Sequence, residues 1–75
     1  MQTGEKHFEN MIRENAGLIH KVCSMYAFTA QDREDLFQEI VIRIWKALPG
    51  FKGLSKESTW MYRIALNAAI VRIKS

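Results

Sequence analysis

Acid and amide side chains recur at helical spacing in the middle of this chain of 75 residues. Gln38 and Glu39 follow Asp35 by three and four residues, so on a helix all three share one face, which Ile42 extends by a turn. Such groups can pair with basic groups of another protein while an apolar residue serves as an anchor. The pattern predicts a partner-binding face, although a solvated face with a scattered surface isoleucine has the same spacing.

Residue types used in catalysis and metal binding are present without forming a complete site. His20 and Cys23 have the spacing of two metal ligands on one helical face, but no second pair completes a tetrahedral site. A packed histidine and thiol explains this pair better. The carboxylates at 32–39 could imitate an acid–base pair, but no nucleophile motif or glycine-rich phosphate loop accompanies them. We therefore expect no enzymatic activity, no metal and no other cofactor.

The net charge of +3 is unevenly distributed. Between Phe28 and Gly50, four acidic residues stand against three basic ones, whereas from Phe51 onward five basic residues oppose only Glu57. A mildly acidic middle and a basic end predict two different partners. The five basic residues are Lys52, Lys56, Arg63, Arg72 and Lys74.

Length and composition indicate one small soluble globular domain. The chain is 48% hydrophobic and 25% charged, which separates it from disordered segments. Its apolar runs are too short to span a bilayer, and residues 1–10 lack the apolar run of a signal peptide. The single cysteine, Cys23, cannot form an internal disulfide. We expect a cytoplasmic protein with no membrane partner.

Apolar periodicity and helix breakers predict three helices. The first runs from about Lys6 to Tyr26, with Asn15 as the polar exception on its apolar side. The second begins near Thr29, where Thr29 and Asp32 resemble a capping box, and it ends before Pro49. Its core-facing residues are expected to be Leu36, Phe37, Ile40, Val41, Ile44, Trp45 and Leu48.

The third helix follows a loop at 51–55 that has no helical periodicity, and Ser55 or Ser58 is the expected N-cap. Because the helical pattern reaches the end of the chain without a C-cap glycine, we expect a fragment of a longer protein. The fold class is all-α, a compact three-helix domain. The apolar stripe of the third helix is expected to comprise Met61, Ile64, Ala65, Ala68 and either Val71 or Arg72.

Several motifs in order resemble conserved region 2 of bacterial sigma-70 family factors, and most of all the extracytoplasmic-function (ECF) group. The motifs are DLFQE at 35–39, RIW at 43–45, a Pro-Gly break, FKG at 51–53 and TWMYRIALN at 59–67. The resemblance extends from about Phe8 to Lys74 and makes residues 1–75 a sigma region 2 domain. It implies a bacterial transcription initiation factor domain.

The resemblance also implies protein partners for the second helix. In the family this helix docks on a coiled coil of the largest subunit of core RNA polymerase, and an anti-sigma factor is a further candidate partner. The residues that would take the polymerase-binding role here are Asp35, Gln38, Glu39, Ile42 and Arg43.

The loop and third helix resemble the part of the family that recognises and melts the promoter minus-ten element by capturing the unpaired non-template strand. A single strand needs cations for its phosphates and aromatic or amide groups for its bases. By resemblance, residues 51–58 would form a pocket for a flipped base and Asn67 would read or border the strand. Trp60 and Tyr62 are either packing residues or wedges that face the strand. The candidate DNA-binding residues are Phe51, Lys52, Gly53, Lys56, Ser58, Trp60, Tyr62, Arg63, Asn67, Arg72 and Lys74.

The chain departs from the family pattern near its end. Many members carry an aspartate where this chain has Val71, and the basic run is reduced to Arg72 and Lys74. The second domain, which reads the minus-thirty-five element, is absent, so we expect weak DNA binding by this chain alone. A protein-interaction module without DNA recognition is the main alternative. A helix-turn-helix reader of duplex DNA fits less well, because the loop before the third helix is too long.

Overall fold

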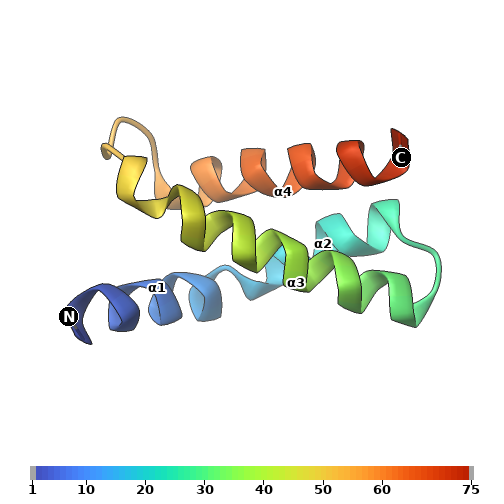
Figure 1. The fold of residues 1–75 in the computed structure, drawn as a ribbon, viewed down its shortest axis with the longest axis horizontal. Coiled ribbons are helices and arrows are strands. Elements are labelled where there is room, and N and C mark those ends of the chain that lie inside the picture. Colours follow the sequence, from blue (N-terminus) through green and yellow to red (C-terminus); the bar gives the residue numbers. More distant parts are fainter. Residues whose placement is uncertain (1, 75) are drawn as a thin grey trace.

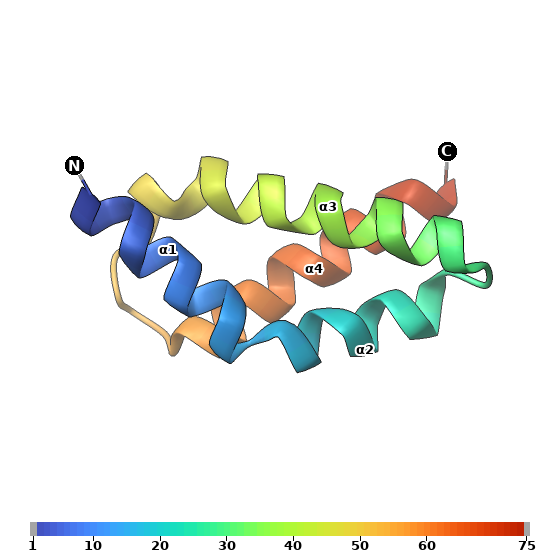
Figure 2. The same cartoon turned by 90° about the horizontal axis from the view of Figure 1, so that it is seen from below.

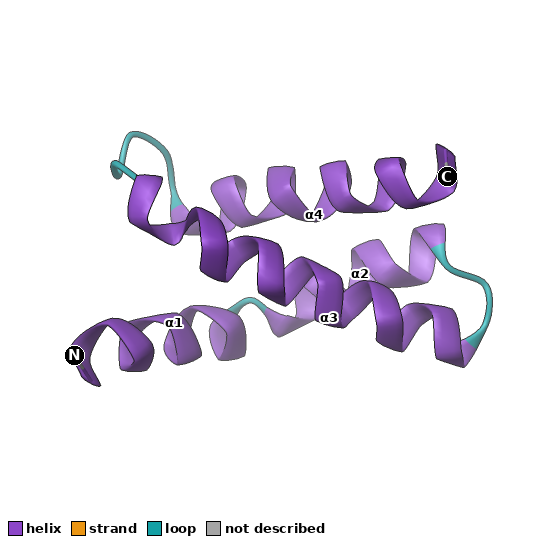
Figure 3. Ribbon diagram, viewed as in Figure 1, coloured by secondary structure: helices purple, strands orange, loops and turns teal. Residues whose placement is uncertain are grey.

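Four α-helices and one turn of 3₁₀ helix make up the part of the chain that the structure describes, residues 2–74 (Figure 1 and Figure 3). The structure is a computed structural model. In chain order the elements are α1 (Gln2–Glu14), α2 (Ala16–Tyr26), α3 (Ala30–Ala47), η1 (Leu48–Gly50) and α4 (Glu57–Lys74). No strand occurs in this range, which confirms the all-α prediction. Among these residues no helix is long and apolar enough to cross a membrane.

The expected first helix is divided at Asn15 into α1 and α2, so the described chain has one helix more than the three predicted. Asn15 leaves helical geometry at φ −113° and ψ 15°. Its side-chain Nδ2 donates to the Met11 carbonyl oxygen at 2.9 Å, the same oxygen that accepts from its backbone N–H at 3.1 Å. This side-chain competition, followed by the flexible Gly17, favours a change of direction. Figure 2 shows α1 leaving at an angle to α2.

Helices α2, α3 and α4 enclose most of the core. α4 contributes mainly Met61 and three alanines, whose short side chains let its backbone approach its neighbours closely. The predicted stripe is confirmed at Met61, Ala65 and Ala68, but Ala69 was missed and Val71 is 49% exposed. The buried apolar residues are Met11, Ile19, Val22, Cys23, Ala27, Leu36, Ile40, Ile44, Met61, Ala65, Ala68 and Ala69.

The prediction that Trp45 belongs to the core is wrong. Its neighbour Ile44 is fully buried, and one further residue turns the helix by about 100°, which places Trp45 on the outer side of α3 with 47% of its surface exposed. The indole packs edge to face against Phe8 of α1, with ring centroids 4.8 Å apart. Trp45 is therefore a half-covered surface residue rather than a core residue.

Local signals set the bounds of α3, as the sequence predicts. Thr29 has extended backbone angles, and its Oγ1 accepts from the Asp32 backbone N–H at 3.0 Å. This is the hydroxyl half of the expected capping box and satisfies one of the unpaired N–H groups at the helix start. At the other end α3 stops at Ala47, and Pro49 lies in the following 3₁₀ turn.

α4 begins at Glu57, and the Lys56 carbonyl accepts the first helical hydrogen bond from the Trp60 N–H at 3.0 Å. Lys56 therefore occupies the N-cap position expected for a serine, and Ser58 lies inside the first turn. In the loop before it, Gly53 adopts φ +74°, a left-handed conformation that glycine reaches without strain. The C-terminal end of α4 lies at the same end of the molecule as the α2–α3 connection, opposite this loop (Figure 1 and Figure 2).

Candidate functional site

The outer side of α3 brings together every residue that sequence reasoning assigned to polymerase binding. One shallow groove is lined by these five residues and by Lys46, which had not been assigned. Asp35 and Gln38 are exposed, Glu39 and Arg43 are half-buried, and Ile42 is 52% exposed. We call this surface the α3 face. It comprises Asp35, Gln38, Glu39, Ile42, Arg43 and Lys46.

The carboxylates of the α3 face already have partners within the chain. Arg43 holds Glu39 Oε2 through Nη2 at 2.9 Å and through Nε at 3.2 Å. Gln31 Nε2 donates to Asp35 Oδ1 at 3.0 Å. Arg72 reaches the same carboxylates from α4, because its two terminal nitrogens lie 3.8 Å from Asp35 and 3.8 Å from Glu39. The face is therefore an organised charge network on a rigid helix.

Two aromatic residues connect the loop to the start of α4. The rings of Phe51 and Trp60 lie 4.7 Å apart with a tilt of 39°. Trp60 also packs against the core, whereas Tyr62 is 37% exposed. The two alternatives for these residues are packing and contact with the strand. In this structure Trp60 is a packing residue, whereas Tyr62 is accessible to a strand. Between Phe51 and α4 the loop exposes Leu54 almost completely, at 92%.

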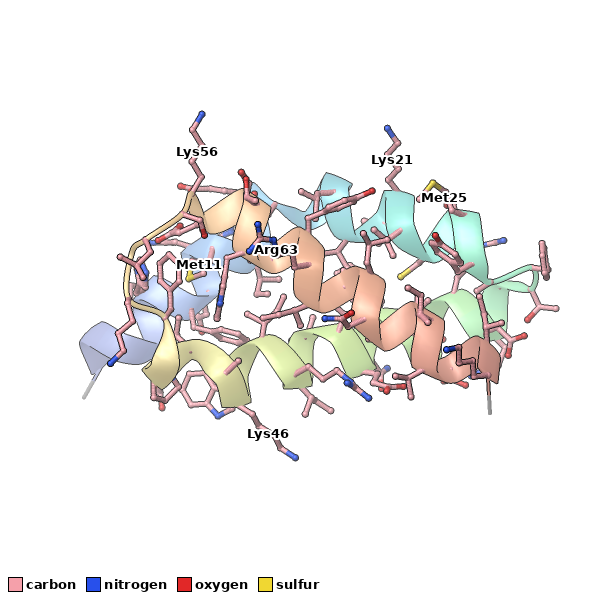
Figure 4. All side chains as sticks on the ribbon, turned by 90° about the horizontal axis from the view of Figure 1, so that it is seen from above. Met11, Lys21, Met25, Lys46, Lys56 and Arg63 are labelled. Atoms are coloured by element: carbon pink, nitrogen blue, oxygen red, sulfur yellow. The ribbon has the colours of Figure 1, made fainter. Side chains whose placement is uncertain are left out.

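Four of the five predicted phosphate contacts are exposed on the loop and α4. Together with Phe51, Trp60, Tyr62 and Asn67 they form the surface that we call the loop–α4 face. In Figure 4 Lys56 projects to the same side as Lys21 of α2, and Lys46 of α3 projects the opposite way. Within residues 2–74 none of the four side chains has an ion-pair partner. They are Lys52, Lys56, Arg63 and Lys74.

Asn67 lies where the two faces meet. Its side chain is exposed and lines a groove between α3 and α4 together with Arg43, Lys46 and Ile64. The sequence had placed Arg43 in the protein-binding set and Asn67 in the DNA-binding set. The fold makes these residues neighbours, so the two candidate surfaces are contiguous along the α3–α4 seam.

A family model described as Sigma-70 region 2 matches residues 11–75. The chain belongs to the sigma-70 region 2 family. This finding confirms the resemblance, and it places both the α3 face and the loop–α4 face within the matched residues.

Relatives of this sigma region 2 chain are RNA polymerase sigma factors, and two of the three described here are named as ECF factors. It is 40% identical over 52 residues to the ECF RNA polymerase sigma factor SigG of Mycobacterium tuberculosis, covering 69% of this chain and 14% of the relative. It is 42% identical over 52 residues to the ECF RNA polymerase sigma-E factor of Escherichia coli, covering 67% and 27%. It is 34% identical over 70 residues to the RNA polymerase sigma-H factor of Pseudomonas aeruginosa, covering 92% and 36%.

The chain therefore spans between about a seventh and about a third of the length of these relatives. No solved structure matches it significantly. The names of the relatives confirm the placement in the ECF group of sigma-70 factors.

Sequence reasoning missed Trp45 as a surface residue of this sigma region 2 chain. Trp45 lines a shallow groove between α1 and α3 together with Phe8, Val41 and Ile42. Because Ile42 also lines the α3 face, the apolar surface continues from that face to the indole. The signal that could have revealed it is the position of Trp45 one residue after Ile44, about 100° around the helix from that fully buried side chain.

His20 and Cys23 each pack against other side chains, and both border one groove between α2 and α3. His20 stacks on Phe37 of α3 with ring centroids 4.5 Å apart. Cys23 is buried in the core, and burial raises the pKa of its thiol, which disfavours the nucleophilic thiolate. No group of three or more residues capable of holding a metal occurs among the described residues.

Proposed function

We propose that this sigma region 2 domain docks on core RNA polymerase through the α3 face and captures the unpaired minus-ten strand through the loop–α4 face. The observation that supports this division is that the two faces differ in whether their charged groups are already ion-paired. The α3 face holds paired carboxylates beside exposed apolar residues, and the loop–α4 face holds an aromatic pair beside cations that have no ion-pair partner within residues 2–74.

Docking on α3 combines apolar burial with steering by charge. Ile42 and Trp45 are 52% and 47% exposed, so both can lose further apolar surface against a partner. Carboxylates at the rim would steer a basic coiled coil of the largest polymerase subunit, which we call the polymerase coil. The apolar residues supply affinity and the charges fix the orientation, a division common in interfaces with an apolar centre and a polar rim.

Strand capture uses the four exposed cations of the loop–α4 face for phosphates. Exposed Tyr62 is available to stack on a base, and Asn67 borders the strand at the α3–α4 seam. Phe51 and Trp60 support the loop at 51–58, which would receive a base flipped out of the duplex. Arg72 is left out of this set, because carboxylates of α3 surround its guanidinium in the unbound chain.

Melting in this mechanism is driven by binding rather than by covalent chemistry. A domain that binds the unpaired strand more tightly than the duplex lowers the free energy of the open state and shifts the population toward it. The promoter sequence selected would depend on contacts to bases in the loop pocket. The mechanism therefore requires a preference for single strands over duplex DNA.

The test is a binding selection on a pool of fluorescent single-stranded oligonucleotides at low salt, with matched duplexes as the control and sequencing of the bound fraction. We expect enrichment of a short motif on single strands and weaker binding of its duplex. Equal affinity for single strands and duplexes would contradict capture. An absence of DNA binding with intact docking on the polymerase coil would favour the alternative, a protein-interaction module whose basic face serves solubility.

A further inference from the structure

Arg72 lies in the last turn of α4 but directs its guanidinium toward α3. Nη2 is 3.6 Å from Asp32 Oδ1 and 3.8 Å from Asp35 Oδ2, and Nη1 is 3.8 Å from Glu39 Oε1. One guanidinium thus spans three carboxylates that occupy successive turns of a single helix face. Two of them, Asp35 and Glu39, belong to the α3 face proposed to dock on polymerase.

This arrangement offsets repulsion within α3. Asp32, Asp35 and Glu39 are spaced three and four residues apart, so their like charges face one another on the helix surface. Arg72 is the counter-ion supplied by another helix, and Arg43 is supplied by α3 itself. The acidic side of α3 therefore meets a partner already partly neutralised.

The contacts of Arg72 are loose enough to be exchanged. They measure 3.6 to 3.8 Å, compared with 2.9 Å for the Arg43–Glu39 pair. The Arg72 side chain keeps 35% of its surface exposed. Exposed pairs of this kind contribute little to folding, and a better-placed cation of a partner can replace them.

We propose that Arg72 is an internal counter-ion of the α3 face, which a basic group of the docking partner must displace. The inference rests on the proposed polymerase docking. In the unbound chain Arg72 occupies the positions on Asp35 and Glu39 that the partner's cation needs, so it lowers the docking affinity and limits weak attachment to other basic surfaces. Docking exchanges one set of ion pairs for another.

The experiment measures the fluorescence anisotropy of the labelled polymerase coil titrated with the wild-type chain, Arg72→Gln and Lys74→Gln. Lys74→Gln is the matched control, because it removes the same charge from the same turn of α4 and Lys74 has no ion-pair partner within residues 2–74. We expect Arg72→Gln to bind about three- to tenfold more tightly and Lys74→Gln to stay within about twofold of wild type.

A second comparison isolates the exchange from net charge. Asp35→Asn removes one of the two carboxylates for which Arg72 and the partner's cation compete. In that background the gain in docking affinity from Arg72→Gln should therefore shrink toward that of Lys74→Gln. Arg72→Lys keeps the charge without the forked geometry and should fall between wild type and Arg72→Gln. Circular dichroism establishes that each variant is as helical as wild type.

The outcomes separate this inference from the proposed function. If wild type binds the coil and Arg72→Gln binds no better than Lys74→Gln, the exchange is wrong and docking through α3 stands. Weaker binding by Arg72→Gln would likewise overturn the exchange and make Arg72 a support of the face. If neither wild type nor any variant binds the coil, both proposals fail.

Discussion

The α3 face and the loop–α4 face differ in how far their charges are satisfied before any partner arrives. On α3, Glu39 is held by Arg43 at 2.9 Å, and Arg72 spans Asp35 and Glu39 from across the α3–α4 seam. On the loop and α4, four cations have no ion-pair partner among residues 2–74. Binding at the first face exchanges existing pairs and buries apolar surface, whereas binding at the second creates new pairs and releases counterions.

This difference predicts two kinds of salt dependence in one small domain. Strand binding should weaken steeply with salt, because each phosphate contact releases a condensed counterion. Docking should weaken less steeply, because part of its affinity comes from burial of Ile42 and Trp45 and its ion pairs replace others. Substitutions on one face should therefore leave binding at the other face unchanged.

The largest effect is expected from reversing charge on the α3 face. The double variant Asp35→Lys with Glu39→Lys would set cations against the basic partner and also repel Arg72. We expect docking on the polymerase coil to weaken by at least about a hundredfold, while single-strand affinity is unchanged or slightly higher. Fluorescence anisotropy with each ligand measures both. A parallel loss of strand binding in a variant of normal helicity would show that the faces are not separable.

The second-largest effect is expected on the loop–α4 face, in the salt dependence of single-strand binding. Replacing Lys52, Lys56 and Arg63 by glutamine removes three candidate phosphate contacts without reversing charge. The slope of log affinity for single-stranded DNA against log salt should fall by about 2, since each lost contact removes about 0.7. Titrations at four or more salt concentrations give this slope.

Lys6→Gln is the control for the triple variant, because Lys6 is an exposed residue of α1 and belongs to neither the α3 face nor the loop–α4 face. It lowers net charge by one but should leave the slope nearly unchanged. Comparable slope losses per charge for Lys6→Gln and for the triple variant would mean that net charge, rather than the loop–α4 face, binds the strand.

The two tryptophans report on the two faces separately. In a Trp60→Phe variant the remaining Trp45 is 47% exposed beside Ile42, so docking of the polymerase coil should shift its emission to shorter wavelength and reduce quenching by acrylamide. Adding single-stranded DNA should change neither. Trp45→Ala should weaken docking by about tenfold. An indole that stays equally quenched while the coil binds would remove Trp45 from the docking surface.

The features that the sequence predicted correctly are those determined by neighbouring residues. The start of α3 follows from the Thr29 hydroxyl and its end from Pro49, and both act within one helical turn. Helical spacing alone places Asp35, Gln38 and Glu39 on one side of that helix. For this reason the bounds of α3 and five of the six residues of the α3 face could be predicted from residues 28–50.

The features that the sequence did not predict depend on contacts between distant segments. The exposure of Trp45 depends on the direction of α1, which the break at Asn15 sets relative to α2. Apolar periodicity does not record that direction. The position of Arg72 beside Asp35 depends on the packing of α4 against α3. A basic residue near the chain end was therefore assigned to phosphate although the fold directs it to carboxylates.

The smallest effect is expected at the N-cap of α3, where a substitution should change stability without changing docking. Thr29→Ala removes the oxygen that accepts from the Asp32 N–H at 3.0 Å, and this should lower the free energy of unfolding by about 1 kcal/mol. Urea denaturation followed by circular dichroism measures the change. Thr59→Ala is the control, because Thr59 is an exposed residue inside the first turn of α4 and makes no capping bond.

Docking affinity should nevertheless stay close to wild type in Thr29→Ala at temperatures where the domain remains folded. The lost hydrogen bond lies at the helix start, and the docking residues from Asp35 onward are held by their own pairs with Gln31, Arg43 and Arg72. A docking loss as large as the stability loss would mean that the first turn of α3 is itself part of the binding surface. Asp32, which contacts both the Thr29 cap and Arg72, would then connect helix capping to the charge network.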